Sequence, residues 1–125
     1  YEGDPLVRSR MRQRMRELLA RDMVRTVPRA DVVVTNPTHY AVALEYKTEA
    51  MEAPMVTAKG RDHVAETIKR LARESSVPTV ENKPLARALF AEVELGDTIP
   101  VKYYEAVAAV LKQVYAMNEK KRRAG

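Results

Sequence analysis

The sequence predicts an α/β fold, in which about four helices surround a small mixed β-sheet of about four strands, with a long basic helix in front. The β-branched segment at 31–35 has the composition of a buried strand, and the hydrophobic segment at 40–46 is predicted to be a second strand. Helical spacing of apolar residues follows at 62–74, before another short strand at 79–81. The order strand, helix, strand favours a right-handed crossover between parallel strands, and 125 residues are enough for one domain.

The N-terminal segment is predicted to be one amphipathic helix that ends near Thr26. Asp4 can accept hydrogen bonds from first-turn amides, and Pro5 suits the first helical position because its missing N–H is harmless there. The apolar positions keep helical spacing and are Val7, Met11, Met15, Leu18, Leu19 and Met23. We interpret this methionine stripe as a packing seam rather than as a binding surface.

The central segments alternate between strands and turns. After the strand at 31–35, the four residues Asn36–His39 form a turn before the strand at 40–46. A third strand is predicted at Pro54–Ala58, followed by a turn at Lys59-Gly60. The helix at 62–74 buries Val64, Ile68, Leu71 and Ala72, and Ser75–Pro78 separates it from the fourth strand.

The last third is predicted to contain helices at 84–93 and 100–117, joined by a turn at Gly96-Asp97. The apolar arc of the last helix approaches half its circumference, which is wider than one core-facing stripe requires. The surplus indicates either a helix wedged between two neighbours or a surface for a partner, and we favour the wedged arrangement.

Basic residues gather at the two ends of the chain. Residues 1–30 hold eight arginines against four acids, and 119–125 hold four basic residues against one acid, whereas the middle is close to neutral. Such an arm could follow nucleic-acid phosphates, lie near an anionic membrane surface, or simply be a solvated helix face. We divide the chain into a linker helix at 1–28, a globular domain at 29–118 and a flexible tail at 119–125.

Composition excludes several kinds of site. The chain has no cysteine and only two widely separated histidines, so neither a disulfide nor a metal cluster is expected, and no cofactor motif is present. No apolar run approaches the roughly 18 residues that a membrane-spanning helix needs. Because the chain begins at Tyr1 without an initiator methionine or a signal peptide, we expect it to be a fragment of a longer protein.

Asn36-Pro37-Thr38-His39 is the segment that could carry chemistry. Its simplest interpretation is a tight turn with proline at the second position. However, the Pro37 nitrogen carries no hydrogen and cannot attack the Asn36 side chain, which closes the usual route of deamidation. The Asn36 amide nitrogen can instead attack its own main-chain carbonyl, close a five-membered succinimide and expel Pro37, thereby breaking the chain.

The turn also contains a group that could move protons. His39 is the residue of the turn whose side-chain type is suited to moving protons near neutral pH, so we assign it as general base or acid, whereas Thr38 would shape the turn. The alternative for His39 is a turn residue that is held by backbone hydrogen bonds. Correct positioning of the reacting groups could supply effective molarities of about 10⁵ M or more.

Several ordered motifs make the chain similar to one family. They are residues 32–44 around Asn-Pro-Thr-His, Gly3-Asp4-Pro5, Ala53-Pro54, Val56–Gly60, Val77-Pro78-Thr79 and Pro84–Phe90. In order and spacing they resemble the cytoplasmic domain of the FlhB/YscU/SpaS family of type III export switch proteins. The resemblance covers essentially the whole chain, and Tyr40 with Lys59-Gly60 favours the flagellar branch over the injectisome branch.

The resemblance implies a single-turnover switch rather than a multiple-turnover enzyme. Family members cleave in cis between the residues equivalent to Asn36 and Pro37, and both pieces stay together. Cleavage lets export change from rod and hook substrates to filament substrates, with a hook-length ruler protein supplying the signal. The resemblance also implies that the whole protein lies in the bacterial inner membrane beside other export gate components, with this domain facing the cytoplasm.

Substrate docking is expected elsewhere on the domain, at Ala53, Pro54, Ala108 and Leu111. We expect the fragment to be monomeric. An injectisome counterpart is the nearest alternative, and a nucleic-acid-binding module that uses the arginine-rich helix is an alternative of a different class. The nucleic-acid interpretation is the weaker, because no aromatic residue is interleaved with the arginines as a base-stacking platform would require.

Overall fold

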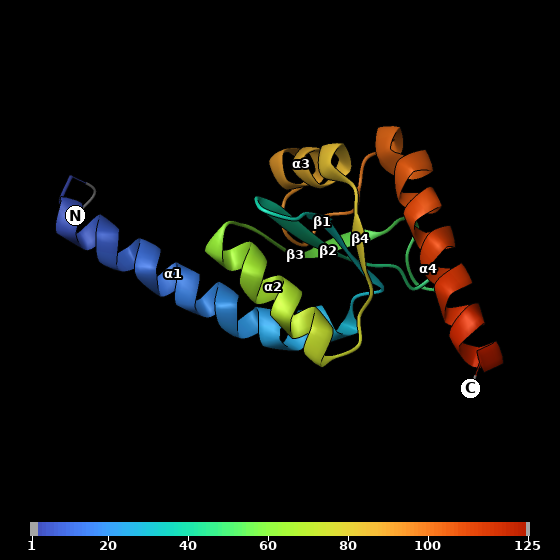
Figure 1. The fold of residues 1–125 in the computed structure, drawn as a ribbon. Helices are drawn as coiled ribbons and strands as arrows, with labels where there is room; N and C mark the ends of the chain where they lie inside the picture. Colours follow the sequence, from blue (N-terminus) through green and yellow to red (C-terminus); the bar gives the residue numbers. More distant parts are fainter. Residues whose placement is uncertain (1–2, 125) are drawn as a thin grey trace.

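The computed structural model describes residues 3–124, apart from the side chains of Arg16, Leu19 and Ala20. The helices are α1 (Pro5–Thr26), α2 (His63–Glu74), α3 (Lys83–Glu92) and α4 (Tyr104–Ala124), with short 3₁₀ helices η1 (Val27–Arg29) and η2 (Val101–Tyr103). The strands are β1 (Val32–Asn36), β2 (Tyr40–Glu45), β3 (Met55–Arg61) and β4 (Thr79–Glu81). This arrangement confirms the predicted α/β fold with its small mixed sheet (Figure 1).

The four strands form one sheet in the order β3-β2-β1-β4. Strand β1 pairs antiparallel with β2 and parallel with β4, and β2 pairs antiparallel with β3. Strands β3 and β4 therefore run in the same direction at opposite edges of the sheet. Helix α2 connects them, as the order strand, helix, strand predicts.

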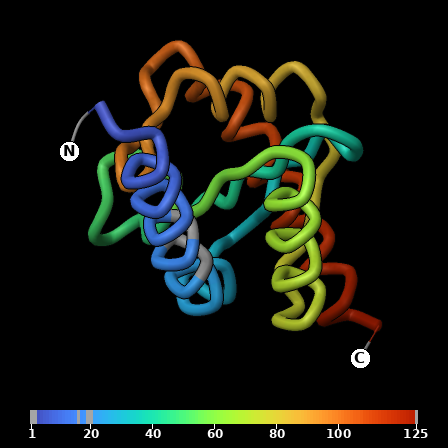
Figure 2. Tube along the Cα trace, turned by 90° about the vertical axis from the view of Figure 1, so that its left-hand side faces the viewer, coloured from blue at the N-terminus to red at the C-terminus, as the bar shows by residue number. Residues whose placement is uncertain are grey.

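Helices cover both faces of the sheet and divide the core in two. Val33, Ala41 and Ala43 pack against α2, η1 and the end of α1, whereas Val34 and Leu44 pack toward α3 and α4. Figures 1 and 2 show α1 and α2 on one side of the sheet and α3 and α4 on the other. Successive side chains of a strand point to opposite faces of the sheet. Because helices cover both faces, β1 is buried along its whole length.

Strand β3 contains a β-bulge that changes which face its residues point to. Ala43 pairs with Ala58 and Leu44 pairs with Val56, so Thr57 is the extra residue. Val56 consequently packs into the α3–α4 core, while Ala58 packs into the α2 core. Without the bulge, both residues would point to the same face.

The predicted turn at Lys59-Gly60 is wrong, because both residues lie inside β3. The glycine is required by packing and not by a turn. A Cβ atom at Gly60 would overlap Val64 Cγ1 and lie 2.7 Å from Val64 Cβ, so α2 can approach the strand this closely only over a glycine. The chain turns later, at Asp62, whose φ of 52° is in the left-handed region.

Helix α1 begins as predicted but packs differently. The Asp4 carboxylate accepts a hydrogen bond from the Leu6 amide at 2.9 Å, and Pro5 follows the cap. The predicted methionine seam is wrong for Met11 and Met15, which are 64% and 56% exposed, and only Met23 near the end of the helix is buried. Their exposure follows from the helix's course, because its N-terminal part projects away from the sheet and leaves these two side chains without a packing neighbour among the described residues (Figure 1).

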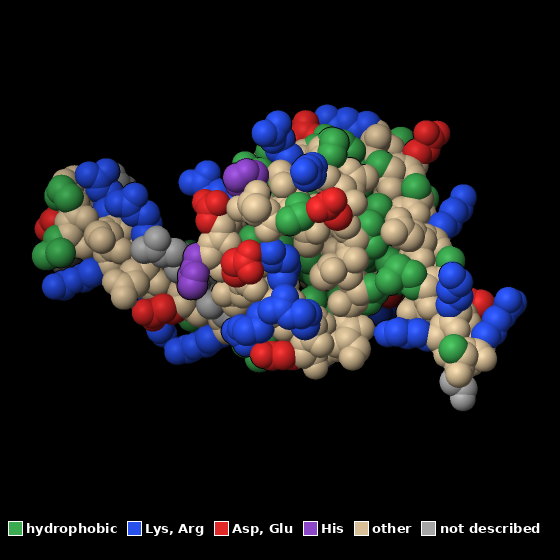
Figure 3. Space-filling model, viewed as in Figure 1, with side chains coloured by type: hydrophobic (Ala, Val, Ile, Leu, Met, Phe, Trp, Pro, Cys, Tyr) green, Lys and Arg blue, Asp and Glu red, His purple; other side chains and the backbone are tan. Residues whose placement is uncertain are grey.

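Helix α4 is longer and less covered than the sequence predicts. It continues past Met117 to Ala124, so residues 119–124, expected to form a tail, are helical here, and Gly125 lies outside the described residues. Glu119 lies 3.7 Å from Arg122 and Arg123, pairs at helical spacing that favour this extension. Lys and Arg side chains are visible along α1 and around the end of α4 (Figure 3).

The expected wedging of α4 between two neighbours is also wrong. One face of the helix buries Val107, Val110 and Val114 against the sheet core. Tyr104 and Tyr115 beside that face are 41% and 50% exposed. The surplus apolar surface is therefore uncovered in the part of the chain that the structure describes.

Over residues 3–124, none of the helices combines the length and the apolar character needed to cross a lipid bilayer.

Replacement of Gly60 by alanine should lower the free energy of unfolding by about 1–3 kcal/mol, because the new methyl group forces Val64 and α2 away from β3. Urea unfolding followed by circular dichroism measures the change. The matched control is Gly3→Ala, since a Cβ at Gly3 meets no atom within 4 Å. Equal stability of the two variants would contradict this account of Gly60.

Candidate functional site

The Asn-Pro-Thr-His segment forms the connection of the β1–β2 hairpin. Asn36 is the last residue of β1, is 8% exposed, and pairs across the ladder with Tyr40. The turn proper is therefore Pro37–His39, one residue shorter than predicted. The Asn36–Pro37 bond therefore joins the sheet to the turn. Asn36 is held by the sheet, whereas Pro37 belongs to the turn.

The carbonyl group of Asn36 already accepts a hydrogen bond. The backbone N–H of His39 donates to the Asn36 oxygen with a nitrogen–oxygen distance of 2.9 Å. This bond closes the turn. It also polarises the carbonyl whose carbon the Asn36 side chain would attack, and it could stabilise negative charge that develops on that oxygen.

His39 is held by its backbone, while its side chain is exposed. Its carbonyl accepts a hydrogen bond of 2.9 Å from the Asp62 amide, so the residue contributes both a backbone donor and a backbone acceptor. The imidazole lies edge-on to the Tyr40 ring, with centroids 6.3 Å apart. Thr38 and His39 are both exposed. The imidazole of His39 can therefore exchange protons with solvent.

A lysine from α2 reaches the turn, and sequence reasoning did not identify it. Lys69 Nζ donates a hydrogen bond of 2.8 Å to the Pro37 carbonyl, and it also lies 2.8 Å from Glu66 Oε1. The hydrogen bond and the charge of Lys69 lower the pKa of Glu66 below its ordinary value. Lys69 is 32 positions from Pro37, so only the folded arrangement brings them together.

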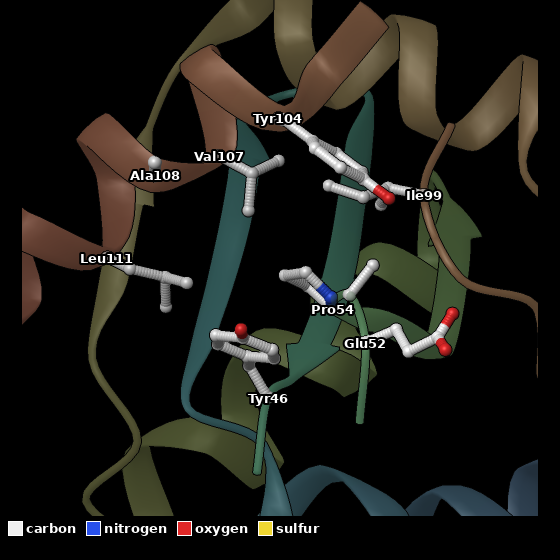
Figure 4. A pocket seen from close by; sticks show the side chains of 9 residues that line it. Tyr46, Glu52, Pro54, Ile99, Tyr104, Val107, Ala108 and Leu111 are labelled. Atoms are coloured by element: carbon white, nitrogen blue, oxygen red, sulfur yellow. The ribbon is translucent and has the colours of Figure 1, made fainter. Parts of the chain in front are cut away.

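The four residues expected to dock substrates lie around one cavity at the other end of the hairpin. Ala53, Pro54, Ala108 and Leu111 line a space of about 170 Å³. Sequence reasoning did not assign the other lining residues, which are Tyr46, Glu52, Ile99, Tyr104 and Val107. Figure 4 shows Val107 and Leu111 of α4 directed toward the space that Pro54 and Tyr46 face from the opposite side.

Backbone pairing holds the two walls of this cavity. The Ile99 amide donates to the Pro54 carbonyl at 2.9 Å, and Met55 pairs with Thr98 in an isolated antiparallel bridge. The segment before α4 thus lies along the edge strand β3. Of the missed residues, Tyr104 and Val107 belong to the broad apolar arc of the last helix, whereas no docking role was expected from the sequence for Tyr46, Glu52 and Ile99.

This cavity is small and apolar. Its volume is below the roughly 300–1,000 Å³ of typical small-molecule sites, so it suits one or two apolar side chains of a peptide. Glu52 is the only charged residue among its lining residues.

A larger cavity of about 550 Å³ lies between the end of α1, strand β3 and α2. Met23, Ala58 and Val64 line it, together with Thr26 and Thr57, whose buried hydroxyl oxygens have no hydrogen-bond partner in the structure. None of the site residues predicted from the sequence borders it. Among the described residues, no group of three His, Asp or Glu side chains is arranged to hold a metal ion.

Comparison with known proteins gives consistent matches. Residues 1–114 match the sequence profile of the FlhB HrpN YscU SpaS family. The chain is 48% identical over 119 residues to the flagellar biosynthetic protein FlhB of Bacillus subtilis, covering 95% of this chain and 33% of that protein. It is 51% identical over 119 residues to FlhB of Borreliella burgdorferi, and the match covers 95% of this chain and 32% of that protein. The chain thus spans about a third of the length of these relatives.

Solved structures share the fold. The cytoplasmic domain of FlhB from Shewanella putrefaciens superimposes with a TM-score of 0.80 at 42% identity, covering 85% of this chain and 81% of that chain. A mutated C-terminal domain of EscU superimposes with a TM-score of 0.71 at 32% identity, and the match covers 74% of this chain and 98% of that chain. The structural similarity therefore extends over most of this chain.

The contact with Lys69 predicts how Glu66 titrates. In an NMR titration, Glu66 should lose its proton below the ordinary glutamate range, and Lys69→Met should raise its pKa toward that range. The ion pair between Glu66 and Lys69 therefore stabilises the folded chain fully above the ordinary pKa of a glutamate. This stabilisation is lost as the pH falls through the lowered pKa of Glu66. Arg70→Met, which removes a neighbouring charge that pairs with Glu74, is the control and should leave the lowered pKa in place. Equal Glu66 curves in both variants would contradict the assignment.

Proposed function

The chain belongs to the FlhB HrpN YscU SpaS family, and on this basis we propose that it is a self-cleaving switch domain of a flagellar export apparatus, cut between Asn36 and Pro37. One observation supports the cleavage above the others. The Asn36 side chain is attached to a rigid, buried strand end, and the carbonyl that it must attack accepts a hydrogen bond from His39 at 2.9 Å. The nucleophile and its target are thus held by different backbone interactions in the same hairpin.

The reaction needs no external reagent. The Asn36 side-chain nitrogen attacks the Asn36 main-chain carbonyl carbon, and a five-membered succinimide closes. The bond to the Pro37 nitrogen breaks, and one proton from the attacking nitrogen is transferred, through His39 or water, to the departing amine. Fragment 1–36 then ends in a succinimide, which water later opens, and fragment 37–125 begins with a free proline amine.

Local geometry favours this route over deamidation. A residue before proline is kept out of the helical region, and Asn36 is extended at the end of β1. Because Pro37 has no N–H, the competing attack on the side chain is closed. The role assigned to the exposed His39 imidazole is proton transfer, and its backbone N–H stabilises the charge on the carbonyl oxygen.

The sheet explains why the two pieces would stay together. Fragment 1–36 contributes β1, which lies between β2 and β4 with all five residues buried, while the other three strands belong to fragment 37–125. One broken bond at the strand end leaves the ladders on both sides of β1 intact. The cut is therefore a single-turnover event in a folded domain, and not the reaction of a turnover enzyme.

In this proposal the cut domain changes which substrates are exported. The cavity lined by Ala53, Pro54, Ala108 and Leu111 would receive an apolar anchor of a rod or hook substrate before the switch to filament substrates. A hook-length ruler protein and other export gate components are the expected partners, at the cytoplasmic face of the inner membrane. The flagellar branch is favoured over the injectisome branch, because identity is 48–51% to the two FlhB proteins and 32% to EscU.

The purified chain should split into fragments 1–36 and 37–125, and Asn36→Ala should leave it whole, because alanine has no side-chain nucleophile. A denaturing gel with mass spectrometry checks this, and fragment 1–36 should first appear one water lighter than a hydrolysed chain. Both fragments should elute together from a sizing column without denaturant.

Asn82→Ala is the control for cleavage. Asn82 caps α3, with its side-chain oxygen accepting from the Leu85 amide at 3.2 Å, so the variant loses about 1 kcal/mol of stability and still splits. A wild-type chain that stays whole through long incubation near neutral pH would rule out the proposed cleavage. A first product that already carries a free carboxylate would point to hydrolysis by a protease.

Ala108→Arg should reduce export of rod and hook substrates at least several-fold in cells that carry the full-length protein, because a charged side chain would occupy the docking cavity. Ala109→Arg is the matched control, since Ala109 is exposed on α4 and does not line the cavity. Export is measured by immunoblotting of culture supernatants, and both variants should still cleave. Equal export by the two variants would argue against docking at this cavity.

A further inference from the structure

Lys69 connects helix α2 to Pro37, the residue that follows the bond that would be cut. Its ammonium group donates to the Pro37 carbonyl at 2.8 Å and also lies 2.8 Å from the Glu66 carboxylate. The Lys69 side chain is only 18% exposed, whereas the side chains of Arg70 and Glu74, one residue and five residues further along the same helix, are 54% and 59% exposed. A partly buried ammonium with two partners is held far more rigidly than an ordinary surface lysine.

This contact fixes the half of the turn that the sheet does not hold. On the Asn36 side, the ladder pairing with Tyr40 and the bond from the His39 amide fix the carbonyl. On the Pro37 side, the pyrrolidine ring fixes φ, and the hydrogen bond from Lys69 restrains ψ by holding the carbonyl oxygen. The peptide plane between Asn36 and Pro37 is thereby restrained at both ends.

We propose that Lys69 is a positioning residue for the cleavage, with Glu66 holding its ammonium group in place. This inference rests on the proposed function, because it concerns the rate of the same reaction. Lys69 touches the residue that leaves and not the atoms that react, so it acts through the orientation of Pro37. Loss of such restraint spreads the turn over conformations in which the Asn36 nitrogen is badly placed for attack.

The positive charge also favours the departure of Pro37. As the bond breaks, the electron pair of the bond passes to the proline nitrogen, which takes up the transferred proton, and the ammonium group hydrogen-bonded to the Pro37 carbonyl withdraws electron density from the residue that leaves. Glu66 keeps the ammonium group directed at the turn, because it pairs with Lys69 at helical i,i+3 spacing.

The test follows cleavage after synthesis in a cell-free translation reaction, where the uncut chain is labelled in a pulse and its conversion to fragments is timed. Lys69→Met, which keeps the length of the side chain and removes the ammonium, should slow cleavage about tenfold or more. Arg70→Met is the matched control and should cleave at the wild-type rate, because Arg70 pairs with Glu74 and not with the turn. Lys69→Arg should recover most of the rate, and Glu66→Gln should give an intermediate rate.

A second readout separates positioning from general stability. In the uncleaved Asn36→Ala background, hydrogen exchange of the His39 amide reports how firmly the turn is closed. Lys69→Met should speed this exchange several-fold, while the amides of β1 within the ladder keep their protection and the urea midpoint stays close to that of Arg70→Met.

Three results would overturn the inference. One is a Lys69→Met chain that cleaves as fast as Arg70→Met. Another is a Lys69→Arg chain as slow as Lys69→Met, which would indicate a packing effect. The third is exchange that rises equally in the turn and in the sheet. A wild-type chain that does not cleave at all identifies a failure of the proposed function itself, whereas a cleaving wild type with an unaffected Lys69→Met identifies a failure of the positioning role alone.

Discussion

The pairing of β1 on both sides is the interaction on which the rest of the structure depends. Its five residues are all buried, its neighbours β2 and β4 come from later in the chain, and both cores pack against it. A strand with two partners cannot leave the sheet without breaking two ladders and exposing apolar side chains to water. Under the proposed function, the chain can therefore be cut at the end of this strand and remain one folded domain. The products would then stay bound, and the proposed reaction would occur once for each chain.

The close approach of α2 to the sheet depends on residues that have no reactive groups. Gly60 leaves room for Val64, and the small side chains Ala41 and Ala43 leave room for the buried face of the helix. With larger residues at these positions, α2 would stand farther from the hairpin, and Lys69 could not reach the Pro37 carbonyl. The bulge at Thr57 belongs to the same arrangement, because it lets β3 supply Val56 to one core and Ala58 to the other.

The sequence predicts the elements of this fold well where a local signal exists. The Asp4-Pro5 cap, the β-branched run of β1 and the helical spacing of α2 are all present where expected. The predictions from sequence are wrong where packing between distant segments determines the role of a residue. Gly60 has the composition of a turn residue, yet it serves a helix contact, and Met11 and Met15 have the spacing of a seam without a partner in the described chain.

The candidate site likewise has a part that the sequence predicts and a part that only the folded structure reveals. Asn36, Pro37 and His39 lie within four consecutive residues, and the chemistry of an Asn-Pro bond follows from its covalent structure alone. Lys69 and Asp62 meet the turn only through folding, and no pattern within α2 distinguishes Lys69 from the other basic residues of that helix. The docking residues come from two distant segments, so their gathering around one cavity depends on the pairing of Pro54 with Ile99.

The turn and the docking cavity lie at opposite ends of β2, and this separation limits how a cut could change docking. Six residues of β2 at about 3.3 Å each place the two sites about 20 Å apart. At the cavity end, the Asp31 carboxylate accepts a hydrogen bond of 2.6 Å from the Tyr46 amide, and the Asp31 amide donates to the Leu44 carbonyl at 2.8 Å. Asp31 would belong to fragment 1–36 and Tyr46 to fragment 37–125, so these bonds would keep the fragments in register beside the cavity after the proposed cut. Under the proposed function, the freedom gained by cleavage would therefore be concentrated at the turn. A change of export specificity would then follow from new mobility of Pro37–His39 and of their contacts with α2, while the cavity keeps its walls.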